Sequence, residues 1–296
     1  MKTEKIFRYN TKNVWFKGNT HIHSTASDGG KTIPELDEMY YSEGYDFLFA
    51  TDHWVCSNVD EYKNQTKLLW LDGVEIDSEE HGEPFYHIVC LGRLKGVSPD
   101  LDIKENIKIV KSQNGFVIMA HPHWCGNSTE DTQKIDFDGV EIYNQVCHLI
   151  NGKSYGGVHW DYMLMRNQNI LAFAADDAHI DNDEPSWNGG WIKVNCESLT
   201  EENVMNSIRN GNFFASTGPD FLDISYSDGK LFLKTSQVTD VRLVGPSYRH
   251  VINSTVLSGR EYTECEIDVP SDWTYYYLEI EDSKGKKAWT NNLFNC

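Results

Sequence analysis

The sequence has no long apolar run and little positive charge. None of its uninterrupted apolar stretches approaches the roughly 20 residues that a membrane-spanning helix needs. Lysine and arginine number 26 against 45 aspartate and glutamate residues among 296, which gives a formal net charge of -19. This balance argues against nonspecific binding to nucleic acid or to an anionic membrane. We therefore expect a cytoplasmic protein with neither a nucleic-acid nor a membrane partner; the oligomeric state is left open.

The cysteines lack the arrangements that build disulfide frameworks or thiolate zinc sites. They are seven, an odd number, they are scattered, and no Cys-x-x-Cys pair occurs. We expect reduced, mostly structural thiols. The sequence also has no internal repeat and no low-complexity segment, and its 40% hydrophobic residues suffice for a sizeable core.

Short apolar runs alternate with helix-like segments between residues 47 and 214, which is typical of a parallel α/β sheet or barrel. Strands are predicted over 47–51, 68–76, 86–91, 116–120, 139–143, 170–174 and 191–194. Helices are predicted after a capping box at Thr32 and Glu35, over 101–113, and from Ser198 to near Gly211. Beyond this region the apolar residues alternate, which predicts a small antiparallel β unit. We expect two domains, residues 1–218 and 219–296.

Histidines and acidic residues gather near the ends of these predicted strands. His21 and His23 lie two apart after an apolar run, so they share one strand face and can bind the same metal ion. Asp28 follows in a flexible turn. Further candidates at or just beyond strand ends, the edge on which α/β barrels build their sites, are His53, Glu75, His121, Asp177 and His179. His87 is also a candidate, but it lies near the start of its strand.

These nine side chains offer only imidazole and carboxylate ligands, which suit Zn, Mn or Fe. Nine ligands exceed the needs of one ion, so we predict two or three divalent ions that share a bridging carboxylate. Asp176 competes with Asp177 as a ligand, but Asp177 has the same strand parity as His179 and is favoured.

The motifs resemble those of the polymerase and histidinol phosphatase (PHP) superfamily of metal-dependent hydrolases. The similarity covers about residues 14–218. Its motifs, which follow the order seen in the family, are His-Ile-His-Ser, Ser-Asp-Gly, Thr-Asp-His, Gly-Val-Glu, His-Ile-Val-Cys-Leu-Gly, Ala-His-Pro and Asp-Asp-Ala-His. The resemblance implies an α/β fold, a distorted (β/α)7 PHP barrel, followed here by the small antiparallel β domain. It also implies three ligand sets: His21, His23, Glu75 and Asp177; Glu75, His87 and His121; and Asp28, His53 and His179. Some branches have histidine where this chain has Asp28.

The end of the chain resembles one branch of that superfamily more closely. Residues 211–219 and 285–292 are similar to sequences of the CehA/McbA-type branch, which includes carbamate-cleaving enzymes. The final motif of the branch usually has proline where this chain has Asn292, and sharing a branch does not determine a substrate.

The expected function is that of a metal-dependent hydrolase, first a phosphoesterase in which a metal-bridged hydroxide attacks a small, anionic phosphoester. Carbamate, amide or ester hydrolysis on the same cluster is the alternative, and a non-catalytic, metal-stabilised binding module is the rival from another class. The catalytic candidates are Glu75 as bridging ligand, Asp28 and His179. Substrate-binding candidates are His123, Asn144, Arg93 and Arg166, for which a supporting or solvated-surface role stays open. Glu141 also ends a strand at this edge.

Overall fold

The computed structural model describes residues 6–78, 85–181, 185–254 and 261–295. It is a mixed α/β fold with one large sheet. The 13 strands of this sheet are, in spatial order, β14 (His250–Ser254), β13 (Asp240–Val244), β16 (Tyr277–Glu281), β17 (Lys287–Thr290), β10 (Phe213–Ser216), β9 (Trp191–Cys196), β2 (Val14–Asn19), β3 (Phe47–Ala50), β4 (Leu69–Asp77), β5 (His87–Leu91), β6 (Phe116–Met119), β7 (Gly139–Asn144) and β8 (Leu171–Ala175).

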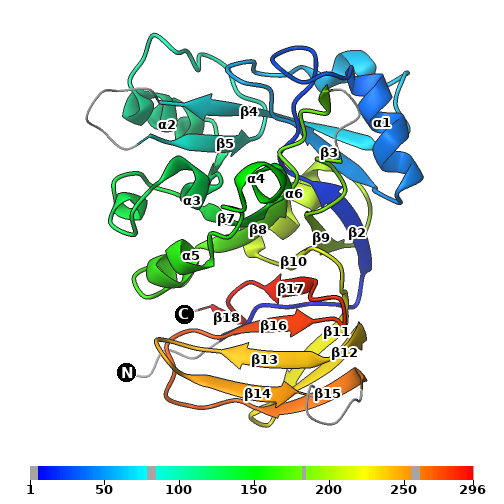
Figure 1. The fold of residues 1–296 in the computed structure, drawn as a ribbon, viewed down its shortest axis with the longest axis vertical. Coiled ribbons are helices and arrows are strands. Elements are labelled where there is room, and N and C mark those ends of the chain that lie inside the picture. The colour runs from blue at the N-terminus through cyan, green and yellow to red at the C-terminus, as the bar shows by residue number, and fades with distance from the viewer. Residues whose placement is uncertain (1–5, 79–84, 182–184, 255–260, 296) are drawn as a thin grey trace.

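Two smaller sheets and six α-helices complete the described elements. One small sheet joins β1 (Ile6–Phe7) to β18 (Phe294–Asn295), and the other contains β11 (Phe221–Ser227), β12 (Lys230–Val238) and β15 (Tyr262–Asp268). The helices are α1 (Ile33–Ser42), α2 (Ile103–Ser112), α3 (Pro122–Cys125), α4 (Gln145–Asn151), α5 (Gly157–Leu164) and α6 (Glu201–Asn210), with 3-10 turns η1 (Val59–Tyr62) and η2 (Asp131–Gln133). Figure 1 shows the helices gathered around β2–β10 and the C-terminal strands on the opposite side of the molecule.

The seven predicted strands coincide with β3 to β9, but their directions are not all parallel as predicted. β5 runs antiparallel to both β4 and β6, and β9 runs antiparallel to β2. The physical reason is that a parallel pair needs a crossover of a dozen or more residues, whereas only the short segment 78–86 links β4 to β5. As a consequence the N-terminal end of β5 lies beside the C-terminal end of β4, with His87 paired with Asp77.

The helix signals agree with the structure apart from one boundary. The Thr32 and Glu35 capping box is present at the start of α1. α6 begins after Thr200, not at Ser198, because the Thr200 side chain accepts a hydrogen bond from the backbone N–H of Asn203 and thereby caps the first turn. The helix ends at Gly211, which has the left-handed conformation expected of a helix C-cap.

The segments that follow β2 and β8 meet at the predicted ligands. Ile22 and Ala178 form a parallel bridge, the N–H of His23 donates to the carbonyl of Ala178 (3.0 Å), and the N–H of Asp177 donates to the carbonyl of His21 (2.9 Å). Two parts of the chain more than 150 residues apart in sequence are thus joined by backbone hydrogen bonds. The mixed α/β architecture is confirmed, whereas the seven-stranded barrel remains a prediction.

The C-terminal strands continue the large sheet. β17 pairs with β10, so residues 287–290 extend the same sheet whose other strands lead to the predicted ligands. At the other end of the chain, β1 pairs with β18, and Tyr9 packs in the core formed by Phe221, Leu231 and other C-terminal apolar side chains. The division at residue 219 stays a prediction.

Two compositional expectations can be compared with the described residues. No helix among them is long and apolar enough to cross a bilayer. None of the six cysteines in the described part of the chain forms a disulfide bond.

Candidate metal centre

The structure places all nine predicted ligands in one continuous cluster, which we call the candidate metal centre. They fall into overlapping groups whose ligand atoms lie within 4.8 Å of one another, and one further residue, Glu141, joins them. The groups are His21, His23, Glu75 and Asp177; His23, Asp28, His53 and His179; His53, Glu75 and His87; and His21, His121 and Glu141.

The first group is the most compact and is fully buried. The Nε2 atoms of His21 and His23 are 3.2 Å apart, and they lie 3.0 and 3.1 Å from Glu75 Oε2 and 3.2 and 3.1 Å from Asp177 Oδ1. A regular tetrahedron with edges near 3.1 Å has its centre about 1.9 Å from each corner, close to the ~2.0–2.2 Å of zinc–nitrogen and zinc–oxygen bonds. The five distances that involve the two imidazole nitrogens therefore suit one tetrahedrally coordinated ion.

Glu75 turns its two carboxylate oxygens towards different histidines. Oε2 faces His21 and His23, while Oε1 lies 2.9 Å from His87 Nδ1 and 3.5 Å from His121 Nε2. Asp177 also presents its two oxygens to different imidazoles, because Oδ1 lies near His21 and His23 whereas Oδ2 lies 3.5 Å from His121 Nε2. A carboxylate that presents each oxygen to a separate set of imidazoles is arranged to bridge two ions.

The third predicted set lies on the more exposed side of the cluster. His179 Nε2 is 3.2 Å from Asp28 Oδ2, and His53 Nε2 is 3.8 Å from the same oxygen. The side chain of Asp28 is 53% exposed, against 21% for His53 and 26% for His179. A small molecule therefore reaches the cluster most directly from this side.

Local backbone geometry aims the ligands. Ile22 is anchored in the core by its bridge to Ala178, and the residues on either side of it, His21 and His23, both turn towards the cluster. His121 (φ 23°) and Asp177 (φ 55°) have left-handed backbones, which cost non-glycine residues about 1–3 kcal/mol each. Strain of this kind concentrates at functional sites and persists only where the surrounding contacts hold it.

Glu141 supports the ligands from behind. Its Oε1 accepts a 2.7 Å hydrogen bond from His21 Nδ1, and its Oε2 accepts bonds from the His121 backbone N–H (3.0 Å) and the Asn144 side chain (2.8 Å). Because Nδ1 of His21 is engaged, its Nε2 is left to bind a cation, as in carboxylate–histidine–metal arrangements. We therefore interpret Glu141 as an orienting residue; its position at the end of β7 was the sequence signal.

Asp77 lies behind His53 in a similar position, and it was missed in the sequence. Its Oδ2 lies 3.3 Å from His53 Nδ1 and accepts a hydrogen bond from the indole N–H of Trp54 (3.1 Å). The sequence signal was available, since Asp77 shares strand parity with Glu75.

Asp176 points away from the cluster. Its carboxylate accepts hydrogen bonds from the backbone N–H groups of residues 188–190 and from the side chains of Asn19 and Tyr40. Burial raises its pKa to about 6. The carboxylate that faces the histidines is that of Asp177.

The electrostatics of the cluster correspond to a site that needs cations. Although burial alone would lower it, the pKa of His21 is raised to about 10 by the charges of Asp177, Glu75 and Glu141. Burial alone would also lower the pKa of His23, but the nearby carboxylates of Asp177, Asp28 and Glu75 raise it. In the metal-free protein, protons on His21 and His23 therefore balance part of the carboxylate charge, and bound cations would displace these protons.

A further observation tests whether metal ions fit. Glu75 Oε2 is buried and accepts no hydrogen bond of acceptable geometry, although three imidazole Nε2 atoms lie within 3.4 Å of it. A buried carboxylate oxygen without a hydrogen bond is costly unless another group binds it. A divalent cation would satisfy this oxygen and the converging nitrogens together.

Of the four predicted substrate-binding residues, Asn144 is nearest the ligands, with its amide 3.3 Å from Asp177 Oδ2. His123 is exposed on α3, one residue after Pro122. Neither arginine is brought to the cluster. Arg93 follows the far end of antiparallel β5 and pairs with Asp60, Asp72 and Glu201. Arg166 stacks on the ring of Tyr162, 3.7 Å from its centroid.

Comparisons with known proteins show the fold. No protein-family model and no curated protein matches the sequence. The structure is similar to a crystal structure of a two-domain protein from Bacteroides vulgatus that contains a predicted PHP-like metal-dependent phosphoesterase, with 16% identity, 99% of both chains covered and a TM-score of 0.55. Weaker similarities are to a candidate metal-dependent phosphoesterase from Bifidobacterium adolescentis (15% identity, 65% of this chain and 96% of that chain, TM-score 0.46) and an amidohydrolase from Chromobacterium violaceum (15% identity, 55% and 87%, TM-score 0.43). The chain therefore has a fold similar to that of the two-domain Bacteroides protein.

Proposed function

We propose that this protein is a PHP-type metal-dependent hydrolase that cleaves a small phosphoester. The observation that carries the proposal is the two-sided arrangement of Glu75, with His21 and His23 facing one oxygen and His87 and His121 facing the other. We infer two to three divalent ions, Zn, Mn or Fe, held by the nine predicted ligands, on a distorted (β/α)7 barrel. From the motif resemblance we further propose membership of the CehA/McbA-type branch and a second domain that begins at residue 219.

When bound, such ions lower the pKa of water, polarise a phosphoryl oxygen and stabilise the leaving oxygen. The protein's own residues would provide the positioning. Glu75 holds the two halves of the cluster at a constant separation, and Glu141 keeps His21 in the orientation that leaves Nε2 available. Asp28 and His179 border the exposed side, where the substrate enters.

Metal content and turnover test the proposal separately. Protein purified without chelator should contain at least two transition-metal ions per chain, and the His21→Ala, His23→Ala double variant should lose one of them. With added Mn²⁺ or Zn²⁺ the wild type should hydrolyse 4-nitrophenyl phosphate or bis(4-nitrophenyl) phosphate, and Glu75→Gln should abolish turnover. His250→Gln, which changes an exposed histidine of the C-terminal part, is the matched control.

The outcomes discriminate among the candidate functions. A protein that binds no metal and cannot be loaded would refute the metal assignment. Metal with turnover of aryl carbamates or esters, but of no phosphoester, would favour the alternative hydrolase. Stoichiometric metal without hydrolysis of any phosphoester, amide or carbamate would favour a non-catalytic binding module.

A further inference from the structure

Two aromatic side chains flank one side of the candidate metal centre. The ring centroid of Phe85 lies 4.9 Å from that of His87, and Trp124 lies 5.5 Å from His87 and 5.2 Å from His121. Phe85 and Trp124 are themselves 6.1 Å apart, and both are partly exposed. They therefore form an apolar border beside two of the predicted ligands.

One short loop holds both aromatic residues. Trp124 lies on α3, where its backbone N–H donates to the carbonyl of His121 (2.9 Å). Asn127, just after that helix, donates from its side chain to the carbonyl of Phe85 (2.8 Å), and its own N–H donates to the carbonyl of Pro122 (2.9 Å). The two rings are therefore positioned by the same segment that begins with a predicted ligand, which is preorganisation of the kind that improves binding.

The chemistry of the pair selects a flat group. Aromatic rings prefer offset or edge-to-face contact with another ring, and such contacts add to the burial of apolar area. Within the described part of the chain the indole N–H of Trp124 makes no hydrogen bond, so this donor remains available to a ligand. A small aliphatic group offers no ring for such contacts.

We infer that Phe85 and Trp124 are specificity-determining residues that bind a planar, apolar group of the substrate, so that the substrate class is an aryl phosphoester. This inference rests on the proposed function for its phosphoester part. The aromatic part stands on the position of the two rings.

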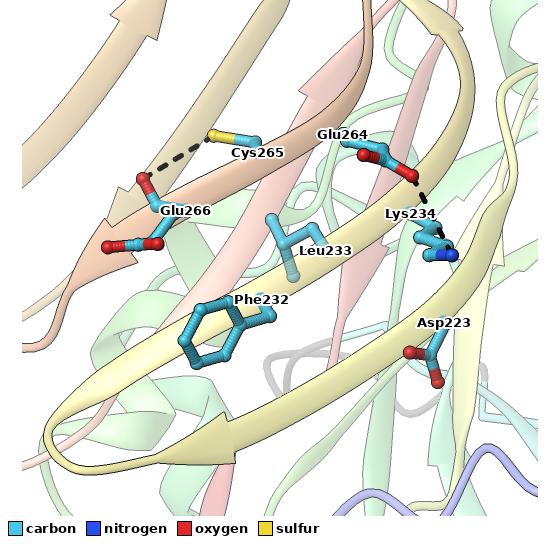
Figure 2. Close-up of a pocket in the computed structure, with 7 residues that line it drawn as sticks. All are labelled: Asp223, Phe232, Leu233, Lys234, Glu264, Cys265 and Glu266. Carbon is cyan, nitrogen blue, oxygen red and sulfur yellow. Dashed lines mark hydrogen bonds and ion pairs between the residues drawn. The ribbon is translucent and has the colours of Figure 1, made fainter.

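A partly exposed aromatic residue elsewhere supplies the control. Phe232 lies on β12 of the C-terminal three-stranded sheet, beside Lys234 and opposite Glu266 (Figure 2). Like Trp124 it is an aromatic side chain at the surface. It lines a surface pocket together with Lys234 and Glu266, and none of the predicted ligands lines that pocket. Phe232→Ala should therefore leave ligand selectivity unchanged.

Binding of ligands that cannot be hydrolysed tests the inference without relying on turnover. Titration calorimetry of the metal-loaded protein would compare phenylphosphonate with methylphosphonate, and benzoate with acetate. We expect the wild type to bind the aryl member of each pair about tenfold more tightly. Trp124→Ala and Phe85→Ala should remove most of this preference, whereas affinity for the methyl ligands and metal content stay constant. Trp124→Phe should retain part of it.

Equal affinities within both pairs, or a preference that Trp124→Ala and Phe85→Ala leave intact, would overturn the inference even if the protein hydrolyses phosphoesters. A protein that binds neither phosphonate but prefers benzoate to acetate would keep the aromatic contact and refute the phosphoester. If Trp124→Ala alone loses metal, the aryl preference of the Phe85→Ala variant decides the test, because Phe85 lies on no helix that carries a ligand.

Discussion

The stability of the metal-free protein should fall as the pH rises from 6.5 to 8, and His21 is one of the buried histidines responsible. The neighbouring carboxylates raise its pKa from 6.5 to about 10 in the folded state, despite burial. A group whose pKa is raised by folding stabilises the fold fully below its unfolded pKa and loses that contribution as the pH approaches the folded value. At 1.36 kcal/mol per pKa unit, the full contribution is about 5 kcal/mol at low pH.

Only part of the stabilisation by His21 is lost within a pH range in which unfolding can be measured. Between pH 6.5 and 8 the loss from His21 amounts to about 2 kcal/mol, and His23, whose pKa is also raised, acts in the same direction. Lys17 acts in the opposite direction, because burial lowers its pKa to about 8 and the folded state releases this proton more readily than the unfolded state. Its stabilising contribution has reached only about 0.4 kcal/mol at pH 8, so the histidines dominate the window of pH 6.5–8.

Urea unfolding in the presence of EDTA measures this effect. The free energy of unfolding of the wild type should decrease across the window, whereas His21→Asn should show a smaller decrease and His250→Gln an unchanged one. Metal loading should abolish the decrease, since coordinated imidazoles carry no titrating proton in the folded state. A wild-type protein equally stable at pH 6.5 and 8, or the same decrease in His21→Asn, would refute the reasoning.

Three further substitutions test the support of the centre and of the sheet. Glu141→Gln weakens the hold on His21 Nδ1, so metal affinity by competition with a chelator should fall about 10- to 100-fold while the fold is retained, and an unchanged affinity would contradict the orienting role. Asp28→Ala should lower phosphoesterase turnover about tenfold or more but total metal by less than one ion per chain; equal losses of both would contradict this separation. Gly18→Ala would place a methyl group 2.3 Å from ring atoms of Phe47, so the unfolding free energy should drop by about 1–3 kcal/mol, and an unchanged urea midpoint would show that the ring can move away.

That the predicted ligands would gather at one edge of the sheet was predictable because strand ends are local features of sequence. Apolar runs mark β3 to β9, and each histidine or acid is placed by counting from the end of its run. Even His87, at the start of its strand, reaches the cluster, because antiparallel β5 presents its N-terminal end at the edge where β4 ends. The branch of the superfamily, the barrel and the native ions remain predictions.

The sequence by itself therefore determined which residue types gather in the candidate metal centre, the strand positions and the helix caps, since these depend on residue identity and short-range periodicity. The tertiary structure decided which way β5 and β9 run, that Glu141 and Asp77 stand behind His21 and His53, and that Arg93 lies beyond the opposite end of β5 from His87. It also decided that Phe85 and Trp124 meet beside the ligands. Each of these depends on pairing between distant segments, and neither composition nor periodicity along one segment carries that information.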